Sequence, residues 1–154
     1  MYSLAVFQPH ALARLLILTA AIEALIQPAL RDKTSVDHVA QLIKMTLDSS
    51  IAKDDKASLL SQLGHMKRNS IRQTGQLLAR ERLPGRVYME MESGDFFDHV
   101  YSMRSNIVHA KGARPTRQKV LTTAYWTQWF VAHLLGFRVL DTSSFRPPLC
   151  CRIN

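Results

Sequence analysis

The stretch HALARLLILTAAIEALIQPAL, residues 10–30, decides the fold class of this chain. Its apolar residues lie nearly all round a helix, which is typical of a helix buried in a protein core. Polar residues and a proline interrupt the run, which is therefore short of the ~20 clean apolar residues that a bilayer core needs: Arg14, Glu23, Gln27 and Pro28. It also lacks the basic start and small-residue cleavage site of a secretory signal. We expect a central core helix, not a membrane segment, that kinks or ends at Pro28.

Two more helical regions are predicted in the first half of the chain. The polar break DKTS comes before the second helix, which Thr34 or Ser35 can cap. Apolar residues then recur every three or four positions. A third helical region starts near Asp55 and contains Gly64 and Gly75. Because glycine weakens a helix interior, we expect this region to be kinked or split.

The second half predicts two helices separated by a short break. The stretch LPGRVYMEMESG, which precedes them, is expected to be a loop, because its alternation of apolar and polar residues is weak. Asp95 can cap the first of the two helices, and Gly112 can end it in a left-handed conformation. Thr116 can cap the last helix, which is expected to close at Gly136.

These elements together predict an all-α bundle of four to six helices. Strands and helices do not alternate, so a parallel α/β fold is not expected. A chain of 154 residues can bury a core, and we expect one domain over residues 1–137 with an irregular tail over residues 138–154. The adjacent Cys150 and Cys151 are too close in sequence to bridge without strain. We therefore expect neither a disulfide framework nor a zinc site, and a cytoplasmic location.

The chain is strongly basic. Lysine and arginine number 20 and aspartate and glutamate 12, which gives a formal net charge of 20 − 12 = +8. A domain this basic favours polyanionic partners, nucleic acid first, and the alternative is a basic surface without such a partner. The clustered basic residues are either a track for RNA or solvated helix faces. They are Lys67, Arg68, Arg72, Arg80, Arg82, Arg86, Lys111, Arg114, Arg117 and Lys119.

An arginine and a histidine stand out in the helix predicted from Phe96 to His109. At 3.6 residues per turn, Arg104 shares a face with three side chains that we expect to be mostly buried: Phe97, Tyr101 and Val108. A charged side chain on such a face needs a partner, because an unpaired buried charge is costly.

The first helix supplies a partner for Arg104. Glu23 lies in line with apolar residues of that helix, and a carboxylate and a guanidinium that point into one core are best paired. His109 shares its side of the helix with Ser105 and Asn106, and it lies in the last turn, where the helix dipole favours a cation. Two interpretations follow. Either a buried ion pair and a helix-ending histidine stabilise the fold, or a fixed cation and a titratable imidazole line one polar pocket.

The stretch FFDHVYSMRSNIVHAKG, residues 96–112, resembles the signature helix of the HEPN superfamily, a group of small all-helical domains. The motif of that superfamily is an arginine, four to six residues of any type, and a histidine, and here Arg104 and His109 enclose four residues. The pattern Y-x-x-R-S-x-I-V-H-G of the Apea-like branch is similar. The sequence AAIEALI around Glu23 also resembles the opening helix of the family. The resemblance covers about residues 10–137.

The resemblance implies metal-independent RNA cleavage with no cofactor. In that chemistry the ribose 2′-OH attacks the phosphate, a base takes its proton, and an acid protonates the leaving 5′-oxygen. Arg104 would stabilise charge on the phosphorane, and His109 would transfer a proton. Ser105 or Asn106 would orient the imidazole or the phosphate, and Tyr101 and Glu23 would support the motif. RNA contacts would come from Lys111, Arg114, Arg117 and Lys119.

The resemblance also implies a homodimer, because in this family the two motifs face each other across an interface. Trp126, Trp129 and Phe130 offer aromatic surface for such an interface. A role in defence or as a toxin follows in the same way, with an antitoxin or another regulatory protein as a partner. Ser105 stands where many catalytic members have asparagine, and Ala110 where glycine is common. These differences do not abolish the chemistry, and they leave room for the alternative, a non-catalytic helical module that binds RNA, a nucleotide or a protein.

Overall fold

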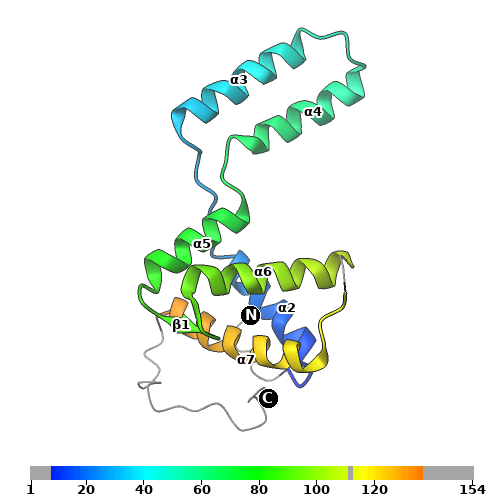
Figure 1. Cartoon of the computed structure of the whole chain (residues 1–154). Helices are drawn as coiled ribbons and strands as arrows, with labels where there is room; N and C mark the ends of the chain where they lie inside the picture. Colours follow the sequence, from blue (N-terminus) through cyan, green and yellow to red (C-terminus); the bar gives the residue numbers. More distant parts are fainter. Residues whose placement is uncertain (1–7, 111–112, 137–154) are drawn as a thin grey trace. The chain divides into compact units, whose positions relative to one another are not determined.

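The structure, a computed structural model, describes residues 8–110 and 113–136 of the chain. Within these ranges it contains six α-helices and one two-stranded sheet (Figure 1): α2 (Ala11–Glu23), α3 (Lys33–Leu47), α4 (Lys53–Met66), α5 (Ile71–Arg82), β1 (Val87–Tyr88), β2 (Met91–Glu92), α6 (Ser93–His109) and α7 (Arg117–Leu134). The predicted all-α bundle of four to six helices is confirmed. The predicted tail over residues 138–154, with its two cysteines, lies outside the described residues.

The chain divides into two compact units. Residues 27–74 form the smaller unit, and the described residues before residue 27 and after residue 74 form the larger one. All described residues of the predicted site belong to the larger unit. The single domain expected over residues 1–137 stays a prediction.

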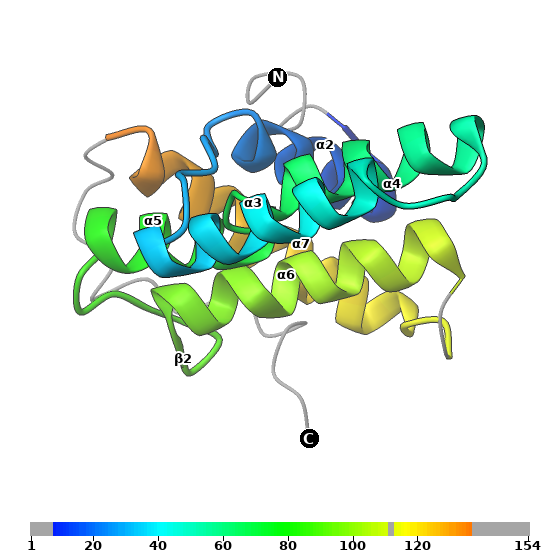
Figure 2. The same ribbon diagram turned by 90° about the horizontal axis from the view of Figure 1, so that it is seen from above.

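The larger unit is built around α2, α6 and α7. α2 packs along α7 and also contacts α6. α6 and α7 run in opposite directions (Figure 2), so the end of α6 lies near the start of α7. The buried core combines these helices with residues of α5 and of the hairpin: Leu15, Leu18, Ile22, Ile26, Ala79, Leu83, Tyr88, Phe96, Phe97, Val100, Met103, Val120, Ala124, Phe130 and Val131.

α2 is the central helix that the sequence predicts, but it is not buried on every side. It ends at Glu23, five residues before Pro28, so the proline does not end it. The N–H of Leu25 already bonds the carbonyl three residues back, at 2.9 Å, which tightens the last turn. Leu12 and Ala20 of this helix are exposed. Among the described residues, no helix is both long and apolar enough to cross a membrane.

The loop predicted before α6 contains a short β-hairpin. Its turn residues Met89 and Glu90 have φ angles of 50° and 63°, the left-handed conformation that asparagine and glycine usually supply, so the sequence carries no turn signal. Tyr88 faces inward and is 2% exposed. Its hydroxyl lies 2.8 Å from Nδ1 of His133 in α7, and burial raises the pKa of Tyr88 to about 12. The packing of Tyr88 therefore stabilises the hairpin, whereas the local sequence preference at the turn opposes it.

The first turns of α6 and α7 differ in how closely they follow the prediction. α6 starts at Ser93, three residues earlier than predicted, because β2 leads directly into it. Asp95 therefore lies in the first turn and not at the cap, and its Oδ1 accepts a hydrogen bond from Arg80 at 3.2 Å. Thr116 caps α7 as predicted, since its Oγ1 accepts the N–H of Lys119 at 3.3 Å.

The smaller unit is a helical hairpin of α3 and α4. Asp32 caps α3 by accepting the N–H of Ser35 at 2.9 Å, so the predicted cap at Thr34 or Ser35 is wrong. Aspartate and serine cap equally well, and the aspartate comes first in the chain. The predicted third helical region is split, and the break between α4 and α5 lies at residues 67–70, away from both glycines. Val39 is the one buried residue in α3 and α4.

Candidate functional site

Arg104 of α6 pairs with the carboxylate at the end of α2. Its Nε lies 3.5 Å from Oε1 of Glu23, which confirms the predicted approach of the two charges. Their side chains are 30% and 22% exposed, so water reaches a pair that was expected to be buried. Phe97 is buried and Tyr101 partly buried, as expected for this face, and their rings stack at 5.9 Å. Val108 is 50% exposed, because the face extends past the core at the end of α6.

His109 lies exposed in the last turn of α6. Ala110 ends the helix in the left-handed conformation, with φ 50°, and its N–H bonds the carbonyl of Asn106. The predicted stop, Gly112, lies outside the described residues. Five positions on an α-helix amount to one full turn plus roughly 140°. Arg104 and His109 therefore leave α6 in different directions, and one chain does not bring them together.

A polar pocket lies beside the face of α6 that carries His109. Its volume is about 250 Å³, and we call it the polar pocket: it is lined by His99, Ser102, Met103, Asn106, Ala113, Pro115 and Lys119. His99, Ser102 and Asn106 follow the three- and four-residue spacing of one helical face, and His109 continues that face one turn later. Of the predicted catalytic residues, Asn106 lines this pocket, whereas Ser105, Arg104 and His109 do not.

His99 is the residue of this pocket that the sequence reasoning missed. Burial lowers the pKa of His99, the charge of Lys119 lowers it further, and Asp98 opposes both effects. The imidazole is therefore neutral at neutral pH. Its Nε2 lies 3.5 Å from Oγ1 of the buried Thr123 in α7. The spacing of polar residues along α6 was a visible signal for His99, but its neighbours on α7 were not visible in the sequence.

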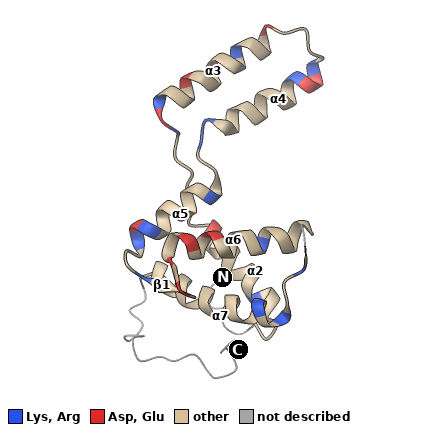
Figure 3. Cartoon of the chain, viewed as in Figure 1, with Lys and Arg blue, Asp and Glu red and all other residues tan. Residues whose placement is uncertain are grey.

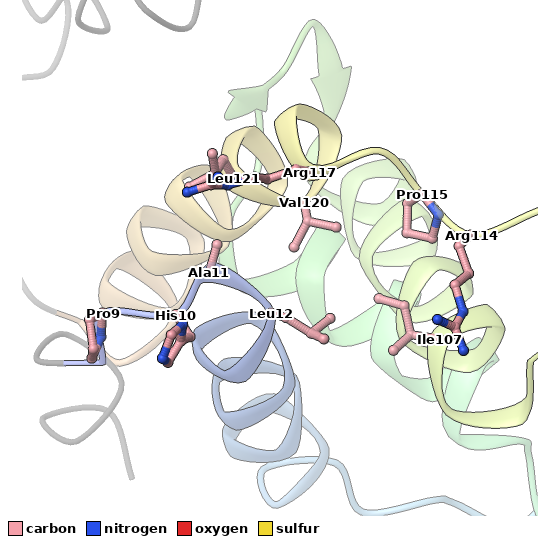
Figure 4. A pocket seen from close by; sticks show the side chains of 10 residues that line it. All are labelled: Pro9, His10, Ala11, Leu12, Ile107, Arg114, Pro115, Arg117, Val120 and Leu121. Carbon is pink, nitrogen blue, oxygen red and sulfur yellow. The ribbon is translucent and has the colours of Figure 1, made fainter.

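A second, larger pocket lies where the starts of α2 and α7 meet the end of α6 (Figure 4). Its volume is about 610 Å³, and we call it the arginine pocket: it is lined by Pro9, His10, Ala11, Leu12, Ile107, Arg114, Pro115, Arg117, Val120 and Leu121. Most of these side chains are apolar, and two are guanidinium groups. Among the described residues of this lining there is no carboxylate.

Three of the four predicted RNA-binding residues line these pockets. Arg114 and Arg117 belong to the arginine pocket and Lys119 to the polar pocket, whereas Lys111 lies outside the described residues. Pro115 belongs to both linings, so the two pockets adjoin. Figure 3 shows this basic segment in blue, in the loop before α7 and in its first turn.

Two arginines that precede α6 take part in contacts within the larger unit. Arg80 pairs with Asp95 at 3.2 Å, and Nη1 of Arg86 lies 3.3 Å from Nε2 of His133. These contacts connect α5 and the hairpin to α6 and α7, so both arginines have a structural role. The basic residues that follow α6 are therefore better candidates for binding RNA.

Comparison with known proteins identifies no relative of this chain. The chain matches no protein-family model, no curated protein and no solved structure. Among residues 8–110 and 113–136, no three histidine, cysteine, aspartate or glutamate side chains gather as a metal site would require. The residues at the junction of α6 and α7 therefore form the candidate functional site.

Proposed function

We propose that this chain is a metal-independent endoribonuclease of the HEPN type that acts where α6 ends and α7 begins. The supporting observation is that Arg114, Arg117 and Lys119 line two adjoining pockets within ten residues of His109. Guanidinium and ammonium groups bind phosphates, and histidine is the side chain that most often transfers protons in catalysis. The positive charge and the proton-transfer group that RNA cleavage needs are thus close in the chain.

The chemistry needs one base and one acid. The ribose 2′-oxygen forms a bond to phosphorus while the bond from phosphorus to the 5′-oxygen breaks. A base takes the 2′-OH proton and an acid protonates the 5′-oxygen, which leaves a 2′,3′-cyclic phosphate and a 5′-hydroxyl. His99 suits the role of base, because burial keeps its imidazole neutral. His109 would then be the acid, and Lys119 would bind a phosphate oxygen.

A homodimer offers another source for the second proton-transfer group, because two facing motifs bring a second His109 to the site. Arg104 and His109 point in different directions, so both would act on one phosphate only if they came from different copies. Trp126 and Trp129 are partly exposed and can contribute to such an interface, but Phe130 is fully buried and cannot. Its predicted place in the aromatic surface is wrong, because α7 turns Phe130 toward Tyr88 and the core.

A non-catalytic module that binds RNA is the second candidate function. The ion pair between Arg104 and Glu23 favours it, because that pair gives the arginine a structural role. Under either function we infer the same setting from the sequence resemblance: a cytoplasmic protein in defence or in a toxin–antitoxin pair, with an antitoxin or other regulatory protein as its partner.

Cleavage of labelled RNA in EDTA tests the proposal. We expect the purified protein to cleave single-stranded RNA, to leave a cyclic phosphate, and to spare RNA with 2′-deoxyribose at the cleaved position. His109→Ala should remove cleavage and leave the circular dichroism spectrum unchanged. His38→Ala is the matched control, because His38 is an exposed helical histidine of the smaller unit. Equal cleavage rates for the wild type and His109→Ala would refute the catalytic assignment.

Mixing the variants Arg104→Gln and His109→Ala separates these two sources of the second proton-transfer group. If Arg104 and His109 act across a dimer, then mixing Arg104→Gln with His109→Ala restores one intact composite site and part of the activity. If His99 and His109 act within one chain, folded Arg104→Gln keeps its activity, and adding His109→Ala does not raise it. His99→Gln should then lower the cleavage rate strongly, and the residual activity should lack the acid limb of the pH–rate profile.

A further inference from the structure

The arginine pocket has the chemistry of a binding site for an organic anion. Its volume of about 610 Å³ falls in the usual range for ligand sites. In the described part of the chain, the side chains of Arg114 and Arg117 form no hydrogen bond and no ion pair. Two guanidinium groups without a counter-charge beside the pocket favour an anion, and their planar forks match a phosphate.

The walls of the pocket favour an apolar group attached to that anion. Leu12 and Leu121 are 45% and 40% exposed, and Ile107 lies on the opposite side of the pocket (Figure 4). Apolar surface that a soluble domain leaves open beside two arginines is suited to a flat ring. Unpaired RNA bases bind in this manner, with one face on apolar side chains or on a guanidinium plane.

The adjoining polar pocket favours a nucleic acid strand over a ligand with a single anionic group, such as a fatty acid. Pro115 forms part of both pockets, and Lys119 provides a further cation on the polar side. A ligand with one anionic group uses only one of these pockets. A chain of phosphates has an anion for each. Duplex RNA keeps its bases stacked inside, so only a single strand presents a base to the arginine pocket.

We propose that the arginine pocket holds one base of a single-stranded RNA, with the phosphates on either side of that base on Arg114 and Arg117, which lie on opposite sides of the pocket (Figure 4), and the strand continuing past Pro115 toward Lys119. This inference rests on RNA being the ligand of the proposed function, and it does not require cleavage. It assigns the substrate class as unpaired RNA and places a base-binding site outside the motif of Arg104 and His109.

Binding measured by fluorescence anisotropy tests the proposal with two matched leucine variants. Leu121→Glu places a carboxylate in the pocket, and Leu59→Glu makes the same change at a leucine of α4 that is also 40% exposed. Base stacking contributes enough that we expect Leu121→Glu to weaken binding of a single-stranded RNA at least about fivefold. Leu59→Glu should change it less than about twofold. Equal affinities for the two variants overturn the proposal.

A strand without bases and a double arginine variant separate the contribution of the base to binding from that of the phosphates. Wild type should bind a strand of abasic nucleotides more weakly than the normal strand, and Leu121→Glu should bind both alike. Arg114→Gln with Arg117→Gln should lower the slope of log affinity against log salt by about two. Arg82→Gln, an exposed arginine of α5, should affect the slope by about one at most.

The binding test and the cleavage test can fail independently of each other. Unchanged RNA affinity in the pocket variants overturns the base-binding site even where the wild type cleaves RNA. Weaker binding in those variants supports the site even where the wild type does not cleave. Tighter binding of duplex than of single-stranded RNA by the wild type also overturns it. A circular dichroism spectrum equal to that of the wild type shows that each variant is folded.

Discussion

The ion pair between Glu23 and Arg104 should stabilise the larger unit by an amount that a double-mutant cycle can measure. Two unit charges 3.5 Å apart attract by about 5 kcal/mol at an effective dielectric constant near 20. Both charges lose hydration when they pair, and the side chains remain 30% and 22% exposed, so water screens much of this attraction. Exposed pairs contribute roughly 0.2–1 kcal/mol, and breaking a buried pair costs roughly 3–5 kcal/mol. We expect a coupling energy of about 1–2 kcal/mol.

The cycle needs Glu23→Gln, Arg104→Gln and the double variant, each unfolded in urea at pH 7. Both tryptophans of the chain, Trp126 and Trp129, lie in α7, which packs along α2, so their fluorescence reports on the larger unit. Glutamine keeps the size of glutamate and removes its charge. High salt should reduce the coupling in part, because the pair is partly exposed. Single effects that add to the double effect within about 0.3 kcal/mol would refute the pairing argument.

The same variants separate stability from catalysis. If Arg104 acts on RNA, Arg104→Gln loses cleavage at temperatures where it is fully folded. Glu23→Gln leaves the arginine in place and keeps most of the activity. If Arg104 is structural, both variants lose activity only in proportion to the folded fraction, and 1 kcal/mol corresponds to a shift of roughly 2–4 °C in Tm for a chain of this size.

Two more predictions follow from buried groups. Gly75→Ala should destabilise the protein by about 1–3 kcal/mol in urea, because a Cβ there overlaps the buried ring of Phe97. In contrast, Gly64→Ala should stabilise α4 by up to about 1 kcal/mol, because a Cβ there meets nothing within 4 Å, and equal effects at the two glycines would contradict the packing. Burial lowers the pKa of His99 and of His133, so the stability they contribute is complete above pH 6.5 and is lost as the pH falls below it. Unfolding free energies measured from pH 7.5 to 5 should therefore decrease, and a variant with glutamine at both histidines should show a shallower decrease.

The sequence could predict features that depend on local chemistry and helical periodicity. Thr116 and Gly136 were expected at the two ends of α7, and Thr116 caps it while Gly136, with φ 77°, follows its end. The approach of Glu23 and Arg104 was also predictable, although they are 81 positions apart in the sequence, because each charge lies on an apolar face that has to pack. Long-range pairing is predictable from one sequence when burying either charge alone is costly.

Features that depend on tertiary packing could not be predicted. The turn at Met89 and Glu90 uses left-handed residues without glycine or asparagine, and the hairpin forms because Tyr88 packs inward against Phe96 and Phe130. Sequence preference at the turn opposes this structure, so the stretch was expected to be a loop. Only the packed core supplies the free energy that overcomes the local preference.

The candidate site also depends on tertiary packing that the sequence motif does not reveal. An arginine and a histidine five positions apart match a sequence motif, yet on a regular helix they point roughly 140° apart. The motif alone therefore cannot define a site within one chain. The groups that do converge on a pocket, His99 and Lys119, come from two helices and are 20 residues apart. Their meeting depends on how α7 returns along α6. A catalytic arrangement in this fold is thus decided by the neighbours of the motif helix, whether those neighbours belong to the same chain or to a second copy.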